Sequence, residues 1–231
     1  MTISKTQMEI SSTKIKQLAE MIPATNVYDV ADVSALTFAK RLSDRHSNQV
    51  WLKREDQQSV FSFKLRGAYN KISNLSKEQL QAGVIAASAG NHAQGVALAA
   101  QRLKINAQIV MPTTTPRIKV ESVRAMGAEV VLYGDNYDEA CGHALELVAT
   151  SAQTFIHPYD DMAVMAGQGT VAKEILEQFE SDIDAVFIPV GGGGLIAGMS
   201  AWIRTHSPKT KIIGVEPADA PTLHAAMAAQ E

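Results

Sequence analysis

Apolar and polar positions along this chain alternate in a pattern that predicts an α/β protein. From about residue 80 onwards, short apolar runs are separated by amphipathic segments with helical spacing. The apolar runs are nearly continuous, which is typical of strands buried on both faces of a parallel sheet. We expect strands at residues 84–88, 107–111, 129–133, 154–156, 184–190 and 211–215, and helices at residues 93–103, 135–148, 169–179 and 195–205. This order predicts parallel sheets flanked by helices.

Local signals mark some of the element boundaries. Thr115 is a predicted N-cap, Pro116 a predicted first helical residue, and Gly127 a predicted end of that helix. A further helical pattern at residues 221–231 is followed by no closing strand. We therefore expect the last part of the α/β fold to be incomplete in this chain.

The composition narrows the class of protein. The chain has 231 residues, 46% of them hydrophobic and 19% charged, with a formal net charge of −3, and these values are ordinary for a soluble globular protein. They argue against a nucleic-acid partner. Cys141 is the single cysteine, so an internal disulfide and a cysteine-pair metal site are both excluded. No secretory signal pattern opens the chain, and no apolar run approaches the ~20 residues of a membrane span. We expect a cytoplasmic protein with no membrane partner.

The segment Val60–Tyr69 contains the most informative lysine. Lys64 lies among two phenylalanines, Phe61 and Phe63, and Leu65. An apolar environment removes solvation from the ammonium, so the pKa falls and the neutral amine becomes a nucleophile. A lysine that holds an aldehyde cofactor as a Schiff base needs this property. Most lysines are surface charges, so the segment alone only suggests such chemistry.

A second motif, Ser88-Ala89-Gly90-Asn91-His92-Ala93-Gln94-Gly95, lies between a predicted strand and a predicted helix. Ligands of open α/β sheets bind at such places. Backbone N–H groups, the Ser88 hydroxyl and the Asn91 amide together favour a carboxylate ligand. The alternative is a tight turn in which Ser88 or Asn91 caps the helix. His92 by itself is typical of a hydrogen-bonded turn residue rather than a catalyst.

The third motif is the run of four glycines at residues 191–194, followed by Leu195, between a predicted strand and a predicted helix. Glycines let backbone N–H groups approach a phosphate at a helix N-terminus. The spacing matches neither a dinucleotide fingerprint nor a P-loop. It therefore favours a phosphate-bearing cofactor without a nucleotide. A flexible turn is the alternative.

Together the three motifs resemble those of the threonine dehydratases, which are pyridoxal-phosphate enzymes of fold type II. The variant Val-Phe-Ser-Phe-Lys-Leu-Arg-Gly is most similar to the biosynthetic enzymes of isoleucine synthesis. The resemblance runs from about residue 22 to the end. It implies a two-lobed fold like that of the tryptophan synthase β subunit. One lobe would comprise residues 1–55 and 155–231, and the smaller lobe residues 56–154 with Lys64 near the junction.

The resemblance also implies roles for individual residues. Lys64 would form the Schiff base with pyridoxal phosphate and later remove the Cα proton of the substrate. Phe63 would lie against the cofactor ring, and Asn91 would bind its 3-hydroxyl oxygen. The remaining implied contacts are the phosphate with Gly191, Gly192, Gly193, Gly194 and Leu195, and the substrate carboxylate with Ser88, Ala89 and His92.

The implied reaction converts the amino acid L-threonine into 2-oxobutanoate and ammonia by α,β-elimination. L-serine dehydration or racemisation is one alternative, and a truncated fragment without catalysis is another. Two departures from the family pattern stand out. Ser34-Ala35-Leu36 replaces a usual Thr-Pro-Leu, and we expect no partner for the pyridine nitrogen and no regulatory domain in this chain. The family resemblance suggests a homo-oligomer.

Overall fold

The structure is a computed structural model that describes residues 5–229, with side chains from residue 12 onwards. Residues 230 and 231 of the last predicted helical segment lie outside the described residues. The chain divides into two compact units. Asn26–Pro158 form the central unit, and the described residues before and after this range form the terminal unit. Each unit is described by itself below.

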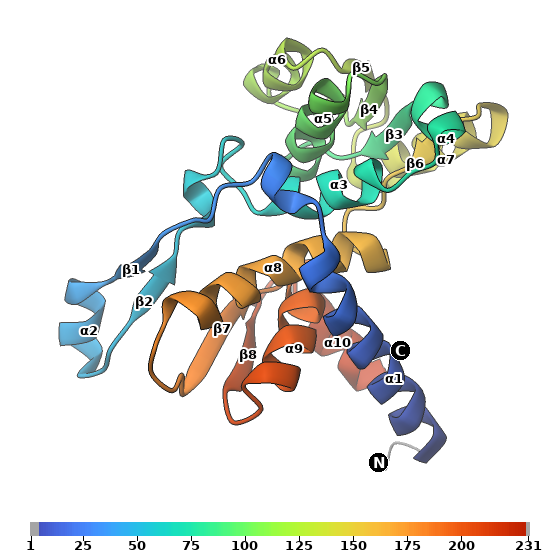
Figure 1. Cartoon of the computed structure of the whole chain (residues 1–231). Helices are drawn as coiled ribbons and strands as arrows, with labels where there is room; N and C mark the ends of the chain where they lie inside the picture. Colours follow the sequence, from blue (N-terminus) through green and yellow to red (C-terminus); the bar gives the residue numbers. More distant parts are fainter. Residues whose placement is uncertain (1–4, 230–231) are drawn as a thin grey trace. The chain divides into compact units, whose positions relative to one another are not determined.

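The central unit is built on a four-stranded sheet in which all neighbouring strands are parallel (Figure 1). The strand order is β5-β4-β3-β6. The strands are β3 (Val84–Ala87), β4 (Ala107–Met111), β5 (Glu129–Leu132) and β6 (Thr154–Phe155). The parallel arrangement predicted from the apolar runs is therefore confirmed in this unit.

Helices cover both faces of this sheet. They are α3 (Lys64–Ser73), α4 (Lys77–Ala82), α5 (Asn91–Leu103), α6 (Arg117–Ala125) and α7 (Tyr137–Thr150). Val84 and Ala86 belong to the same hydrophobic cluster as residues of α3 and α5. Ile85 and Ala87 belong to the cluster that includes α7. Because successive side chains of a strand point to opposite faces, the continuous apolar run is buried on both sides.

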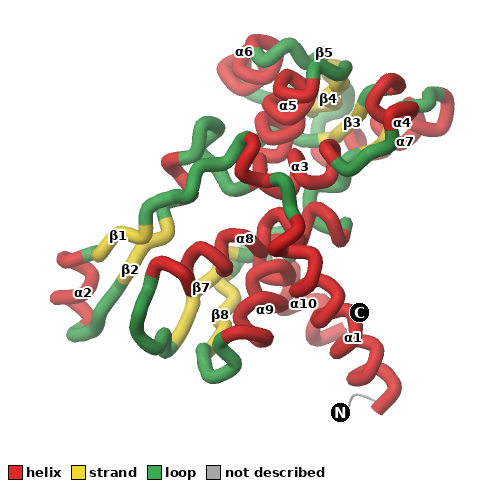
Figure 2. Tube along the Cα trace, in the orientation of Figure 1, coloured by secondary structure: helices red, strands yellow, loops and turns green. Residues whose placement is uncertain are grey.

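The first part of the central unit contains a short antiparallel pair that the strand pattern did not predict (yellow in Figure 2). Its elements are η2 (Val27–Asp29), β1 (Leu36–Phe38), α2 (Lys40–His46), β2 (Trp51–Lys53) and η3 (Glu55–Gln57). This part is bonded to α3, because Tyr69 Oη donates to Asp29 Oδ2 at 2.9 Å and Asn26 N donates to Asn70 Oδ1 at 3.2 Å. The boundaries of the compact units fall at 25/26 and 158/159. The lobe boundaries at 55/56 and 154/155 stay a prediction from the sequence.

The terminal unit combines helices with a two-stranded parallel sheet (Figure 1). Its helices are α1 (Lys5–Met21), η1 (Ile22–Ala24), α8 (Met162–Gln178), α9 (Gly194–His206) and α10 (Thr222–Ala229). Its strands are β7 (Ala185–Pro189) and β8 (Lys211–Val215). The helices α8 and α9 approach closely at Gly169 and Gly198, where an added Cβ on Gly198 would overlap the carbonyl oxygen of Met165.

Most predicted elements are present, but two helix starts differ from expectation. The helix expected from residue 169 begins at Met162, because Asp161 Oδ1 accepts hydrogen bonds from the N–H groups of Ala163 at 2.8 Å and Val164 at 3.1 Å. Thr115 does not cap α6: its hydroxyl is buried and has no hydrogen-bond partner among the described residues. Gly127 follows α6 with a φ of +88°, a conformation that favours glycine.

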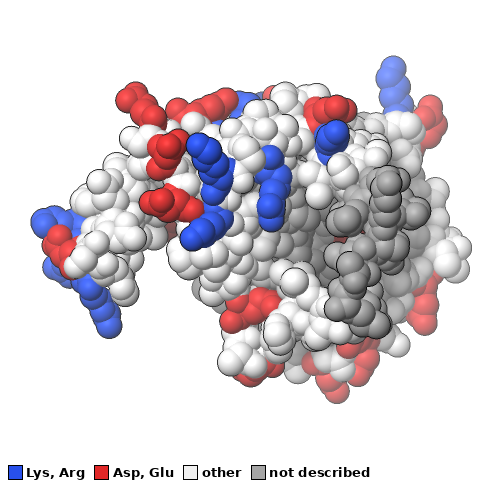
Figure 3. All heavy atoms as spheres, turned by 90° about the horizontal axis from the view of Figure 1, so that it is seen from below, with Lys and Arg blue, Asp and Glu red and all other residues white. Residues whose placement is uncertain are grey.

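Charged side chains of both signs are interspersed on the face shown in Figure 3. This distribution agrees with the small net charge of −3. Within residues 5–229, no helix is long and apolar enough to cross a lipid bilayer.

Candidate functional site

Lys64 begins α3, and its side chain is half-buried in the central unit. Nζ donates a hydrogen bond to the carbonyl oxygen of Pro158 at 2.7 Å and lies 5.7 Å from the centroid of the Phe63 ring. Burial lowers the pKa of Lys64 from 10.5 to about 8. At pH 7 this shift gives roughly 300-fold more neutral amine than an ordinary lysine has. The prediction of a desolvated lysine is confirmed, although Phe61 does not contribute, because its ring is 76% exposed.

The backbone around Lys64 is fixed by two neighbours. The Ser62 hydroxyl accepts a hydrogen bond from the Lys64 N–H at 3.2 Å. Gly95 of α5 faces the same peptide, and a Cβ at that position would lie 3.1 Å from the carbonyl atoms of Lys64. Such a distance is tighter than ordinary van der Waals contact, so the glycine permits the close approach of α5 to α3. The second motif thus supports the lysine through Gly95, a role that sequence reasoning missed.

The turn between β3 and α5 places its polar groups at the start of a helix. The Ser88 N–H donates to the Val110 carbonyl oxygen at 3.1 Å, and the Ser88 hydroxyl accepts from the Gly90 N–H at 3.2 Å. Gly90 is the N-cap of α5, and no side chain caps the helix. Neither Ser88 nor Asn91 therefore acts as the cap that the alternative interpretation required. The first N–H groups of α5 lack a side-chain acceptor, as an anion-binding turn needs.

Asn91 and His92 follow this turn in different environments. Asn91 is exposed, and its side chain makes no hydrogen bond within the described part of the chain. His92 is 3% exposed, and its Nε2 lies 2.9 Å from the Ile156 carbonyl oxygen. Because a carbonyl oxygen only accepts, Nε2 carries the proton and Nδ1 does not. Burial lowers the pKa of His92 to about 4, so the ring is neutral at pH 7.

The segment that follows β6 accepts hydrogen bonds from a residue of each of the first two motifs. Its Ile156 carbonyl accepts from His92, and its Pro158 carbonyl accepts from Lys64. His92 Nδ1 is buried and has no hydrogen-bond partner among the described residues. Sequence reasoning missed this segment, because a backbone carbonyl leaves no signal in a residue pattern.

In the terminal unit, the glycine run connects β7 to α9. A Cβ on Gly192 would overlap the ring of Tyr159, and a Cβ on Gly194 would lie 3.0 Å from the Tyr159 backbone. Gly191 and Gly193 would meet no atom within 4 Å, and Gly193 has a φ of +90°. Two glycines thus permit packing on Tyr159, while the other two leave the backbone uncovered on an open side.

Further groups complete the surroundings of the glycine run. Gly193 is the N-cap of α9, and no side chain caps this helix. The N–H groups at the helix start are therefore available to a phosphate, with the helix dipole in the favourable direction. The Thr222 hydroxyl donates to the Gly191 carbonyl oxygen at 2.8 Å and fixes the start of the run. Tyr159 and Thr222 are distant in sequence, so the motif did not reveal them.

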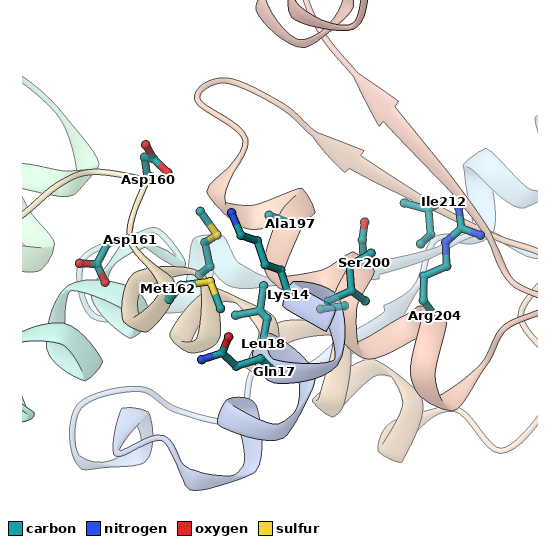
Figure 4. Close-up of a pocket in the computed structure, with 13 residues that line it drawn as sticks. Lys14, Gln17, Leu18, Asp160, Asp161, Met162, Ala197, Ser200, Arg204 and Ile212 are labelled. Carbon is teal, nitrogen blue, oxygen red and sulfur yellow. The ribbon is translucent and has the colours of Figure 1, made fainter. Parts of the chain in front are cut away.

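The terminal unit also contains a groove of about 730 Å³ (Figure 4). It lies between α1 and the helices α8 and α9, and its sides carry Lys14, Met162, Ser200 and Arg204. None of the residues that the sequence singled out lines it. The candidate residues are therefore those of the three motifs, each described within its own unit, and not those of this groove.

The groups of these motifs fit pyridoxal phosphate. Lys64 offers an amine of lowered pKa to the aldehyde, the uncapped start of α9 offers N–H donors to the phosphate, and Asn91 offers a free amide. No group of three or more His, Cys, Asp or Glu side chains that could hold a metal ion occurs among the described residues.

Comparison with known proteins agrees with this chemistry. Residues 29–231 match the family described as pyridoxal-phosphate dependent enzyme. The chain therefore belongs to this family, whose members depend on pyridoxal phosphate.

Within the family, the chain is similar to threonine dehydratases. It is 61% identical over 196 residues to threonine dehydratase 2 biosynthetic, chloroplastic, of Solanum lycopersicum, covering 85% of this chain and 33% of that protein. The solved processed form of threonine deaminase isoform 2 from Solanum lycopersicum is 56% identical with a TM-score of 0.92, covering 95% of this chain and 60% of the other. Maize serine racemase is 30% identical with a TM-score of 0.85, covering 95% and 65%. The chain thus spans about a third of the length of its curated plant relative.

Proposed function

We propose that this chain carries the pyridoxal-phosphate site of a threonine dehydratase. The reaction converts L-threonine into 2-oxobutanoate and ammonia and is the first step towards isoleucine. The observation that carries the proposal is the half-buried Lys64 amine, whose pKa is lowered to about 8 and which donates a hydrogen bond to the Pro158 carbonyl oxygen. Relatives named threonine dehydratase supply the substrate and the reaction class.

In the proposed mechanism, pyridoxal phosphate supplies the electron sink that makes the Cα proton of the amino acid acidic. Lys64 would hold the cofactor through its amine, and as a neutral base the same amine would take the Cα proton of the substrate. The Cβ–O bond would break, the hydroxyl would take up a proton and leave as water, and a Cα=Cβ double bond would form. Hydrolysis of the released enamine consumes one water and gives 2-oxobutanoate and ammonia, so the atoms balance. The Pro158 carbonyl provides a hydrogen-bond partner for the lysine while it carries the proton.

The other residues have binding roles in this proposal. Phe63 lies against the cofactor ring, and Asn91 binds the 3-hydroxyl oxygen with its free amide. The substrate carboxylate is bound at Ser88, Ala89 and His92. Because the His92 side chain is buried against Ile156, its contribution comes from the backbone N–H. The phosphate is bound by the backbone of Gly191, Gly192, Gly193, Gly194 and Leu195.

Reductive trapping tests the proposal directly. The chain is mixed with pyridoxal phosphate, reduced with borohydride, and digested, and the labelled lysines are identified by mass spectrometry. We expect Lys64 to be labelled far more strongly than exposed Lys119, because burial lowers the pKa of Lys64 to about 8. A Lys64→Ala variant should lose this label and the associated near-visible absorbance. Equal labelling of the two lysines in the parent chain would contradict the proposal.

The phosphate contact is tested by comparing pyridoxal phosphate with pyridoxal. Gly191→Ala adds a methyl group on the open side of the glycine run. We expect it to weaken labelling of Lys64 by pyridoxal phosphate several-fold and to leave labelling by pyridoxal unchanged. Gly142→Ala is the matched control, because it also adds a methyl group into open space, but on α7. An equal loss with both reagents would remove the phosphate assignment.

Substrate choice is tested by adding L-threonine or L-serine to the unreduced chain loaded with pyridoxal phosphate and measuring the release of 2-oxo acid. The likeness to maize serine racemase makes serine the second candidate substrate. Discrimination by one methyl group is worth only ~1–3 kcal/mol, so both rates need to be measured. A homo-oligomeric state, a cytoplasmic location and the absence of nucleic-acid and membrane partners stay predictions from the sequence.

A further inference from the structure

A buried ion pair lies next to Lys64 in the central unit. Arg66 is fully buried, and its guanidinium meets the Glu55 carboxylate through two hydrogen bonds, Nε to Oε2 and NH2 to Oε1, each 2.8 Å long. The Arg66 NH2 group also donates to the Asp32 carbonyl oxygen at 3.1 Å. Burial of an ion pair is costly, and such pairs are often replaced by apolar residues without loss of stability. Stability alone therefore does not account for this pair.

The ion pair joins the two ends of the segment 55–66. Near its first end, the Gln58 side chain accepts from the Asp32 N–H at 3.0 Å and donates to the Asp32 carbonyl oxygen at 2.7 Å. The Ser34 hydroxyl donates to Glu55 Oε1 at 2.6 Å. At its second end, Arg66 is the third residue of α3. The base of the segment is therefore held by side-chain bonds.

The middle of the segment is strained. Phe61 has a φ of +57°, a left-handed conformation that is unfavourable for a bulky side chain. Its ring is 76% exposed, so ring contacts do not compensate for the conformation. The Phe61 N–H donates to the Gln58 carbonyl oxygen at 2.7 Å, which closes a tight turn. Strain of this kind persists only where the surroundings impose it, and here the anchored ends of the segment do so.

Lys64 follows the strained turn by three residues and is the first residue of α3. Its N–H is bonded to the Ser62 hydroxyl, and its amine to the Pro158 carbonyl. A change in the turn would therefore change the direction in which the amine extends. All these residues belong to the central unit.

We propose that Glu55 and Arg66 are positioning residues for Lys64: their ion pair imposes the strained Phe61 turn and thereby fixes the lysine amine for cofactor attachment. The proposal rests on the proposed function of Lys64.

The neighbouring residues offer a matched control. Asp56 and Arg54 also form a paired ion contact, with Nε to Oδ1 at 2.9 Å and NH2 to Oδ2 at 2.8 Å, but Asp56 is exposed and this pair does not bond to α3. Glu55→Gln and Asp56→Asn each replace one carboxylate by an amide of the same shape. The two variants therefore differ in which ion pair is weakened.

The readout is the ratio of borohydride-trapped pyridoxal phosphate at Lys64 to that at Lys119, together with the melting temperature of each variant. We expect Glu55→Gln to lower the ratio by about tenfold, since a displacement on the order of 1 Å can cost about 100-fold in a positioned reaction. Asp56→Asn should leave the ratio within about twofold. Arg66→Lys keeps the positive charge but loses the paired geometry, and it should resemble Glu55→Gln. An unchanged ratio in Glu55→Gln would overturn the proposal.

A second variant separates positioning from simple support of the fold. Phe61→Gly removes the strain and should raise the melting temperature of Glu55→Gln. Because glycine adopts the left-handed turn without the ion pair, labelling of Lys64 should return in Phe61→Gly/Glu55→Gln if the pair acts through the turn. If labelling stays low there although the melting temperature recovers, or if it returns equally in Glu55→Gln/Gly142→Ala, which adds stability on α7 and not at the turn, the proposal is wrong. Absence of selective Lys64 labelling in the parent chain would instead contradict the proposed function, so the two failures are distinguishable.

Discussion

The parallel sheets of the two units differ in how their faces are covered. Every residue of β3 in the central unit is fully buried, with alternate side chains under α5 and α7. In the terminal unit, only one face of the β7–β8 pair is covered. Ile188 is fully buried, whereas Phe187, Ile213 and Val215 on the opposite face are 66%, 36% and 49% exposed.

This difference shows what an apolar run does and does not establish. Residues 84–88 and 184–190 have the same pattern, and both form parallel strands as predicted. A continuous run indicates that both faces of a strand suit a nonpolar environment. It does not indicate that both faces are covered. The outer face of β7–β8 is therefore an exposed apolar surface, of the kind that promotes association in solution.

The strongest test of this comparison is the same isoleucine-to-alanine substitution in both sheets. Ile109 and Ile213 are the middle residues of β4 and β8, and they are 0% and 36% exposed. Ile109→Ala removes buried methyl groups from a covered core and should lower the free energy of unfolding by about 2–5 kcal/mol. Ile213→Ala should cost less than about 1 kcal/mol, because its side chain is partly in water already.

The two tryptophans allow each unit to be followed separately in urea. Trp51 lies in the central unit and Trp202 in the terminal unit. Trp202→Phe leaves a reporter of the central unit, and Trp51→Phe leaves a reporter of the terminal unit. Equal losses for the two isoleucine variants would show that the outer face of β8 is covered in solution, for example by association between chains.

The fold of the central unit was largely predictable from the sequence, because each of its buried strands is a local apolar run followed by a helical pattern. The antiparallel β1–β2 pair was not predictable in this way. Its strands have only three residues each, and several of their side chains are exposed, so they leave no apolar run. The start of α8 was missed for a different reason. The capping role of Asp161 depends on its extended backbone conformation, which composition does not show.

A smaller effect on the free energy of unfolding is expected from Lys64 in the central unit. Lys64 has a folded pKa of about 8, below its ordinary 10.5. The unfolded chain therefore binds more protons between these values, and stability rises with pH from about 8 to 10.5. At pH 7 the cost of burying the ammonium is fully present. Lys64→Met should raise the free energy of unfolding there by about 1–3 kcal/mol and remove the rise above pH 8.

Urea unfolding of the single-tryptophan form with Trp51, at pH 7 and pH 10, measures this effect. Lys119→Met is the matched control, since Lys119 is exposed on α6 of the same unit and its loss should change stability by less than about 0.5 kcal/mol. A loss of stability in Lys64→Met would mean that the bond from Nζ to the Pro158 carbonyl outweighs the desolvation of the amine.

The candidate site was predictable to the extent that its groups are side chains or glycines in sequence order. Lys64, the turn before α5 and the glycine run were found because each occurs at a strand–helix junction or in an apolar segment. The Pro158 carbonyl, the Tyr159 ring and Thr222 were not found, because they contact the motifs through tertiary structure. Phe61 was misjudged as an apolar neighbour of the lysine, since its left-handed backbone turns the ring to solvent.

The smallest effect on the melting temperature is expected from two helix caps, a charged one in the terminal unit and a neutral one in the central unit. The Glu216 carboxylate accepts hydrogen bonds from the N–H groups of Leu223 at 2.6 Å and His224 at 3.0 Å, at the start of α10. These bonds, the Leu223 bond first, lower the pKa of Glu216 below 4.5. Asn136 caps α7 with an uncharged amide that accepts from the Glu139 N–H at 3.0 Å.

A group with a lowered folded pKa stabilises the protein above its ordinary pKa and loses this contribution as the pH falls through the folded value. Glu216→Gln should therefore lower the melting temperature of the terminal unit slightly at pH 6, and the difference from the parent should be smaller at pH 3, because the lowered pKa of Glu216 lies below its ordinary 4.5. The effect is small because the carboxylate is exposed to water and salt. Asn136→Ala should lower the melting temperature of the central unit by the same amount at both pH values, because an amide does not titrate. Trp202 and Trp51 fluorescence report the two transitions, and a Glu216→Gln difference that persists undiminished at pH 3 would show that the shape of the side chain, rather than its charge, caps α10.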